Sequence, residues 1–109
     1  MAELSPPVTE ADPQEVKAWL DAGTAVLIDV REPNETAAER IAEAKLLPLS
    51  SFDPSQVEAK PGQKVVFQCA MGGRSARAAA ASAAAGVKNA VNLRGGIRAW
   101  KAAGLPTIS

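Results

Sequence analysis

The chain contains a single cysteine, Cys69, and the residues that follow it could make its thiol reactive. Gly72 and Gly73 stand shortly after it, and Arg74 and Ser75 come next. Glycines let a loop turn without steric cost, so that successive backbone N–H groups can point inward as an anion-binding nest. A cysteine in such a setting has a lowered thiol pKa, and its thiolate is a nucleophile. The pattern predicts a reactive cysteine in a cradle of N–H donors.

A second interpretation of Cys69 is purely structural, because a lone cysteine is often a small buried apolar side chain. The two glycines and Arg74 favour the reactive interpretation, since reactive cysteines need electropositive surroundings. If the role were only structural, Cys69 would resist alkylation in the native protein.

The cysteine loop, residues 69–75, lies between segments with opposite conformational preferences. Residues 65–67, Val-Val-Phe, lead into it and favour a strand. Residues 76–85 lead out of it and are mostly alanine, the best helix former. We therefore expect Cys69 at the carboxyl end of a strand and a helix that begins at about Arg74, whose amino terminus contributes to the anion cradle.

Sequence patterns elsewhere predict strands and helices in alternation. Residues 25–30 are nearly all apolar, as in a parallel strand that is covered on both faces. Asp12, Pro13 and Glu15 mark the start of a helix, and Gly23 marks its end. The other expected elements are an edge strand near 7–9, a short helix over 33–40, a strand over 45–49, helical turns within 51–59, a strand over 89–93 and a terminal helix that ends at Gly104.

This alternation predicts an α/β fold, with a parallel sheet of about five strands flanked by helices on both faces. A chain of 109 residues suits one domain with one core. We expect residues 1–109 to form that domain, with residues 1–11 as a partly ordered lead-in.

The composition excludes several kinds of site. The sequence has no histidine and one cysteine, so it offers no Cys–His catalytic pair, no zinc-binding set of the usual kind and no Cys-x-x-Cys redox pair. We expect no metal and no cofactor. No signal peptide and no apolar run of membrane-spanning length is visible, so the expected location is cytoplasmic, with neither membrane nor nucleic acid as a partner.

Charge is unevenly distributed along the chain although the net charge is zero. All 12 acidic residues lie in residues 1–58, whereas residues 59–109 contain only basic charges. The basic half contains Cys69, so its field could draw a small anion toward the loop. Alternatively, the two halves pack together and neutralise one another.

Three stretches resemble the signature motifs of rhodanese-type sulfurtransferases. The first is the loop pattern Cys-x-x-Gly-x-Arg-Ser at 69–75, and the second is Leu-Ile-Asp-Val-Arg-Glu-Pro at 27–33. The third is Leu-Arg-Gly-Gly-Ile-Arg-Ala-Trp at 93–100, followed by Ala-Gly-Leu-Pro at 103–106. They follow the order found in the family and cover most of the chain, so the resemblance implies a single rhodanese-like domain.

The resemblance also implies a reaction. The Cys69 thiolate would take the outer sulfur of thiosulfate or of a persulfide donor, and with thiosulfate it would release sulfite. The resulting persulfide would then pass its sulfur to cyanide, a small thiol or a protein thiol. The residues expected to bind the substrate are those of the loop: Ala70, Met71, Gly72, Gly73, Arg74 and Ser75.

One stretch departs from the family. Many members have an aromatic residue where this chain has Thr36, and Gly-His-Ile-Pro-Gly-Ala where it has residues 39–44, Glu-Arg-Ile-Ala-Glu-Ala. Only Ile41 and Ala44 fit that pattern, so the conformation of this connection is left open.

Three charged residues are expected to support the loop, with alternative roles. Asp29 either forms a structural ion pair or supports the cysteine loop through Arg31 or Arg74, and Arg31 is expected to pair with nearby acids. Arg74 either faces the substrate or turns back to pair with an acid such as Asp29 or Glu32.

Two other functions use a cysteine in a loop of this kind, and the sequence disfavours the first of them. Cysteine phosphatases need five residues between cysteine and arginine, whereas four separate Cys69 from Arg74, so the smaller ring suits one sulfur atom better than a phosphoryl group. A non-turnover relay module that hands persulfide sulfur to a partner protein would use Cys69 as the enzyme does. Met71 could offer an apolar contact to the acceptor.

Overall fold

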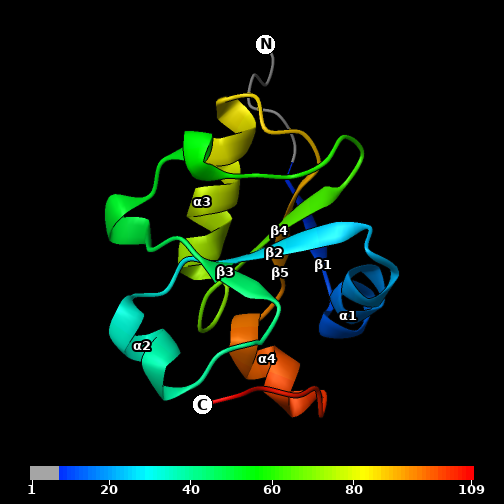
Figure 1. Cartoon of the computed structure of the whole chain (residues 1–109), viewed down its shortest axis with the longest axis vertical. Helices are drawn as coiled ribbons and strands as arrows, with labels where there is room; N and C mark the ends of the chain where they lie inside the picture. Colours follow the sequence, from blue (N-terminus) through cyan, green and yellow to red (C-terminus); the bar gives the residue numbers. More distant parts are fainter. Residues whose placement is uncertain (1–7) are drawn as a thin grey trace.

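The five strands found among the described residues belong to one parallel sheet. The computed structural model describes residues 8–109. The strands are β1 (Thr9–Ala11), β2 (Ala25–Asp29), β3 (Ala44–Leu46), β4 (Lys64–Gln68) and β5 (Ala90–Leu93), and their spatial order is β1-β5-β4-β2-β3 (Figure 1). The expected parallel sheet of about five strands is confirmed. Strand β4, which leads into the cysteine loop, lies at its centre.

Helices cover both faces of the sheet and form two apolar clusters. The helices are α1 (Pro13–Ala22), α2 (Pro33–Ala38), α3 (Gly73–Ala84) and α4 (Gly96–Ala102). On one face, Val16 of α1 and Trp100 of α4 pack against Leu27 and Val66. On the other face, the buried alanines of α3 pack with sheet residues in a second cluster; they are Ala78, Ala79 and Ala83. Alanine has almost no side chain, which lets α3 approach the sheet closely.

Several boundaries differ from those expected. Strand β3 ends at Leu46 and not at residue 49, although the N–H groups of Leu47 and Leu49 still donate to the carbonyl groups of Asp29 and Val30 at the end of β2. Two short 3₁₀ turns follow, at Leu49–Ser51 and Pro54–Gln56. The short helix α2 ends at Ala38, before the residue 40 that the sequence suggested.

The edge strand begins later than expected. Strand β1 covers Thr9–Ala11 and pairs with β5, and Ala11 is fully buried in the first cluster. The remainder of the expected lead-in, residues 1–7, lies outside the described residues. Within residues 8–109, no helix combines the length and the apolarity needed to cross a bilayer.

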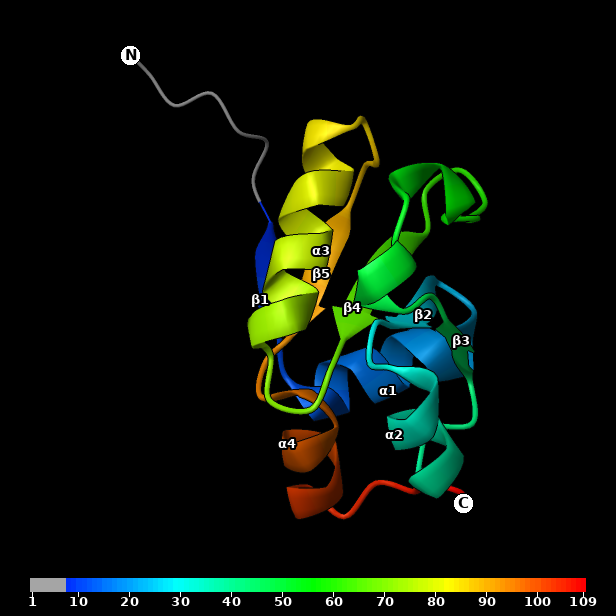
Figure 2. The same ribbon diagram turned by 90° about the vertical axis from the view of Figure 1, so that its left-hand side faces the viewer.

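The start of helix α4 holds the beginning of the cysteine loop in place. The backbone N–H of Ile97 donates to the carbonyl oxygen of Cys69 at 2.8 Å, and that of Arg98 donates to the carbonyl of Ala70 at 3.1 Å. Gly96 is buried at this contact and has a φ of +61°. In Figure 2, the loop between β4 and α3 lies directly over α4. Strand β4, helix α3 and helix α4 therefore meet at the cysteine.

We expect Gly96→Ala to destabilise the protein and to disturb the loop. A Cβ at this position would lie only 2.2 Å from the carbonyl oxygen of Cys69, so the backbone would have to move. The matched control is Gly104→Ala, because Gly104 also has a positive φ, +80°, but has no atom within 4 Å of the added Cβ. In urea unfolding, Gly96→Ala should lower the free energy of unfolding by about 1–3 kcal/mol more than Gly104→Ala does, which is the cost of overpacking. Equal losses for the two variants would contradict this packing.

Candidate active site

Cys69 lies immediately after β4, at the edge of the sheet where the carboxyl ends of all five strands meet. Its exposure is only 2%, and it packs against the second apolar cluster. It nevertheless lines a surface cavity of about 350 Å³, together with Ala70, Met71, Gly73, Arg74 and Arg77. The cysteine is therefore protected from bulk water but borders a space that a small molecule could enter.

Backbone N–H groups of the loop point at the sulfur, as the glycine spacing predicts. The N–H of Gly72 donates to the Cys69 Sγ at 3.0 Å, and Gly72 adopts a φ of +108°, which favours glycine. Burial raises the pKa of the Cys69 thiol, but hydrogen bonds from the Ser75 hydroxyl and from the N–H groups of Ser75, Gly72 and Met71 outweigh it. The net pKa is lowered, because these donors stabilise the thiolate.

The hydroxyl of Ser75 lies close to the sulfur and belongs to a polar network that runs from the buried Ser75 and Asn92 to the exposed Glu10. Its Oγ is 3.4 Å from Cys69 Sγ and 2.6 Å from Asn92 Oδ1. Asn92, on β5, donates through Nδ2 to Glu10 of β1 at 3.0 Å and to the carbonyl of Gly72 at 3.3 Å. The Ser75 hydroxyl also lies 3.3 Å from the backbone carbonyl of Gly72, so it has both a side-chain and a backbone partner.

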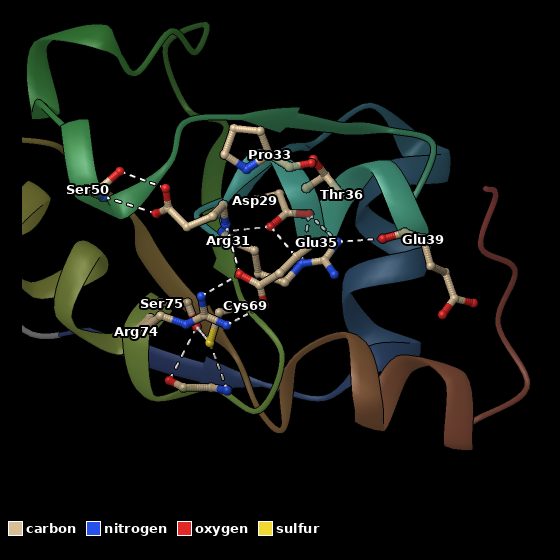
Figure 3. Close-up of polar contacts among 12 residues, drawn as sticks. Asp29, Arg31, Pro33, Glu35, Thr36, Glu39, Ser50, Cys69, Arg74 and Ser75 are labelled. Atoms are coloured by element: carbon tan, nitrogen blue, oxygen red, sulfur yellow. Dashed lines mark hydrogen bonds and ion pairs between the residues drawn. The ribbon is translucent and has the colours of Figure 1, made fainter.

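Arg74 lines the cavity and its guanidinium reaches helix α2, where it pairs with Glu35 (Figure 3). Its two terminal nitrogens bond the two carboxylate oxygens at 2.7 and 2.9 Å. This contact lowers the pKa of Glu35 from its ordinary 4.5 to about 2 and raises that of Arg74. This pair is the bracing contact expected of Arg74, but the partner is Glu35 and not Asp29 or Glu32. A role of Arg74 in substrate binding stays a prediction.

Asp29 and Arg31 form their own buried pair and do not touch the cysteine loop directly. Arg31 Nη2 lies 2.8 Å from Asp29 Oδ2, and both side chains are almost fully buried. The same nitrogen donates to the carbonyl of Glu39 at 2.8 Å, just beyond the end of α2. The pair therefore anchors α2, which in turn presents Glu35 to Arg74 (Figure 3).

The segment that departs from the family, residues 39–44, is held by the carboxyl-terminal residues. Arg40 and Ile108 exchange two backbone hydrogen bonds of 2.8 Å, and the Glu39 carboxylate pairs with Lys101 at 2.7 Å. Ile41 is completely buried in the first cluster. These contacts fix the connection without the glycines, proline and histidine found in many members of the family.

The outer wall of the cavity is basic and partly apolar. Met71 is 64% exposed at the loop tip, and Arg98 of α4 donates to its sulfur at 3.1 Å. Arg77 of α3 is also exposed and forms no ion pair with any residue of the described chain. Within residues 8–109, no cluster of three or more His, Cys, Asp or Glu side chains is placed to hold a metal ion.

Sequence reasoning missed three residues of the site: Glu10, Glu35 and Asn92. Asn92 carried one signal, since it is a polar residue inside an apolar strand, Ala-Val-Asn-Leu at 90–93. Glu10 and Glu35 carried none, because each reaches the site through strand order or helix placement. Glu10 stands 82 residues from Asn92 in the chain and Glu35 stands 39 from Arg74.

The Arg74–Glu35 pair should make stability depend on pH in a defined acidic range. Because the pKa of Glu35 is lower in the folded state, its contribution is complete above about 4.5 and is lost as the pH falls toward about 2. Both side chains are about one-third exposed, so we expect Glu35→Gln to cost only about 1 kcal/mol at neutral pH. Urea unfolding of the parent protein and of Glu35→Gln should be measured across this pH range. The difference between their free energies of unfolding should vanish at the acidic end.

The matched control is Glu58→Gln, which removes a carboxylate that pairs with Lys45 but is 83% exposed. This variant should unfold like the parent protein at every pH. A loss for Glu35→Gln that did not change with pH would exclude the ion pair as its cause.

Comparison with known proteins identifies the family. The sequence matches the family model described as "Rhodanese-like domain" over residues 12–103. A protein named "Sulfurtransferase" from Allochromatium vinosum is 35% identical over 103 residues, which cover 94% of this chain and 96% of that protein. An uncharacterized protein of Synechocystis is 40% identical over 96 residues, 88% of this chain. The chain spans only about half of that relative, 54% of its length.

The fold has solved counterparts as well. The crystal structure of a thiosulfate sulfurtransferase from Pseudomonas aeruginosa aligns with a TM-score of 0.82 and 28% identity. The alignment covers 93% of this chain but 20% of the Pseudomonas chain, so it concerns one part of a larger protein. With the family match over most of its length, and with the sheet order and cysteine loop described above, the chain belongs to the rhodanese-like domain family.

Proposed function

We propose that the chain is a sulfurtransferase that carries sulfur as a persulfide on Cys69, with thiosulfate as a donor in vitro. The observation that supports this most directly is the 3.0 Å contact between the N–H of Gly72 and the Cys69 sulfur, in a loop that borders an open cavity. A donor at this distance stabilises an anionic sulfur. The names of the Allochromatium relative and of the Pseudomonas protein both agree with sulfur transfer.

The first step is a displacement at sulfur. The Cys69 thiolate attacks the outer sulfur of thiosulfate, a new S–S bond forms, and the S–S bond of thiosulfate breaks. Sulfite leaves with the electron pair of that bond. Nucleophile and leaving group are both anions, so no general base is needed once the thiolate exists.

The second step regenerates the free Cys69 thiolate. An acceptor such as cyanide or a thiol attacks the outer sulfur of the persulfide, and the Cys69 thiolate leaves. The N–H groups that lower the pKa of the thiol also stabilise the leaving thiolate in this step. The overall cycle is a ping-pong transfer.

Two features of the loop argue against phosphate chemistry. Four residues separate Cys69 from Arg74, which makes the ring of N–H groups smaller than the cysteine phosphatases need. The guanidinium of Arg74 is also occupied by Glu35 through two short hydrogen bonds, 2.7 and 2.9 Å. It is therefore not free to clamp a phosphoryl group as a bidentate donor.

We expect Cys69→Ser to abolish transfer from thiosulfate to cyanide, because an alcohol in this position does not form a persulfide. The fold should be retained, since a serine hydroxyl can accept the same N–H of Gly72. Intact-mass spectrometry after treatment with thiosulfate should find one added sulfur in the parent protein and none in Cys69→Ser. Sulfur transfer at the parental rate by Cys69→Ser would refute the proposal.

A relay that passes sulfur to a partner protein is the second candidate. It is supported by Met71, which is 64% exposed next to the cysteine and offers an apolar contact to a docking protein. The two candidates differ in their donors. An enzyme of the thiosulfate type turns over repeatedly with thiosulfate and cyanide, whereas a relay becomes loaded only from a protein persulfide.

A loading experiment separates these candidates. The purified protein is incubated either with thiosulfate or with the persulfide form of a cysteine desulfurase, and the added sulfur is measured by mass spectrometry. We expect loading from thiosulfate followed by steady formation of thiocyanate when cyanide is added. Loading from the desulfurase alone would favour the relay and contradict the enzyme.

A further inference from the structure

The hydroxyl group of Ser75 has one proton and three acceptors within reach. Its oxygen lies 2.6 Å from Asn92 Oδ1, 3.3 Å from the carbonyl oxygen of Gly72 and 3.4 Å from Cys69 Sγ. Ser75 is completely buried, so no solvent molecule relieves this competition at the surface. The position of that one proton decides whether the sulfur has a second hydrogen-bond donor besides the loop N–H groups.

The neighbours of Asn92 determine which end of its amide faces Ser75. Its other end lies 3.0 Å from a carboxylate oxygen of Glu10 and 3.3 Å from the carbonyl oxygen of Gly72. Both of these groups accept hydrogen bonds, so the NH₂ group must point toward them. The amide oxygen therefore faces Ser75, and because that oxygen can only accept, the Ser75 hydroxyl donates to it.

We infer that Asn92 competes with the Cys69 sulfur for the single Ser75 proton and thereby limits how much thiolate the resting site holds. While the hydroxyl donates to Asn92, it presents a lone pair to the sulfur. In that arrangement, the hydroxyl oxygen accepts a hydrogen bond from the S–H of the neutral thiol. When the thiol loses its proton to solvent through the cavity, the hydroxyl must rotate away from Asn92 before it can donate to the thiolate.

Asn92 is thus a positioning residue that acts through Ser75. Glu10 accepts a hydrogen bond from the Asn92 amide and thereby holds it in this orientation. Since a hydrogen bond to a charged acceptor is stronger than one to a neutral acceptor, the two positions of the proton can be close in free energy. The same exchange would occur in each cycle of the proposed sulfurtransferase, on which this consequence rests, because the sulfur alternates between thiolate and persulfide.

The other charged groups around the sulfur do not change with this proton. From α3, Arg74 and Arg77 line the cavity, and Arg74 is paired with Glu35 of α2. From β1, Glu10 is separated from the sulfur by Asn92 and Ser75. The charges of these residues are the same for both positions of the Ser75 proton. The position of that proton therefore changes the ionisation of Cys69 in addition to their effect.

We expect Asn92→Ala to lower the pH at which Cys69 ionises, since the Ser75 hydroxyl then no longer has to break its bond to Asn92 in order to donate to the thiolate. The titration can be followed by the ultraviolet absorbance of the thiolate. The sequence has one cysteine and no tyrosine, so no other side chain of the protein gives a rising signal in this assay. At a pH below the midpoint, alkylation by iodoacetamide should become about three- to tenfold faster, as expected when one neutral hydrogen bond no longer has to be broken.

The decisive comparison is made in a Ser75→Ala background. Ser75→Ala alone should raise the ionisation midpoint, because the shared donor is lost. If Asn92 acts through Ser75, adding Asn92→Ala to that variant should produce no further shift. An equal shift with and without Ser75, or a midpoint that stays constant or rises in Asn92→Ala, would overturn the inference.

Two further variants separate this effect from charge and from packing. Glu10→Gln should leave the midpoint nearly unchanged, since the glutamine oxygen still accepts from Asn92, and the Glu10→Gln, Asn92→Ala pair should retain the downward shift. If Asn92→Ala does not fold, Asn92→Leu fills a similar volume and also lacks the acceptor. Because titration and alkylation need no sulfur donor, these outcomes stand apart from the test of sulfur transfer: a protein without that activity could still show the predicted shifts.

Discussion

The hydrogen bond from the Gly72 N–H to the Cys69 sulfur, 3.0 Å long, is the contact on which the rest of the site depends. It requires the chain to reverse direction within a few residues, between the end of β4 and the start of α3. Gly72 makes this possible because its φ of +108° is a conformation that other residues rarely adopt. The loop turns its amides inward, so a buried thiol that would otherwise be difficult to ionise acquires donors for its charge.

Neighbouring elements of the fold hold this loop in place. Each neighbour of the central strand β4 supplies some of this support. On one side, β5 contributes Asn92, which donates to the carbonyl of Gly72 and accepts from the hydroxyl of Ser75. Strand β1 contributes Glu10, which accepts a hydrogen bond from Asn92. On the other side, β2 leads into α2, which contributes Glu35. From below, the start of α4 bonds the carbonyl groups of Cys69 and Ala70.

Arg31 and Arg74, two arginines near the loop, each pair with a carboxylate. Arg31 is buried against Asp29 and fixes the far end of α2, and Arg74 is fixed by Glu35 at the near end. Both guanidinium groups thus form bidentate pairs with carboxylates, which connect α2 to β2 and to the cysteine loop. The basic groups that remain at the cavity rim are Arg77 and Arg98, which lie nearer to solvent.

The sequence by itself determined the elements that depend on local preference. The valine-rich strand, the glycine turn and the alanine helix around Cys69 follow from the conformations that neighbouring residues favour, and so does the lowered pKa of the thiol. Only the tertiary structure decided which partners the loop residues take. Glu35 displaced the expected Asp29 and Glu32 because α2 directs it at Arg74, and Asn92 meets Ser75 because β5 pairs with β4. Contacts of this kind depend on strand order and helix placement, which are properties of the folded chain as a whole and leave no mark in the spacing of the residues concerned.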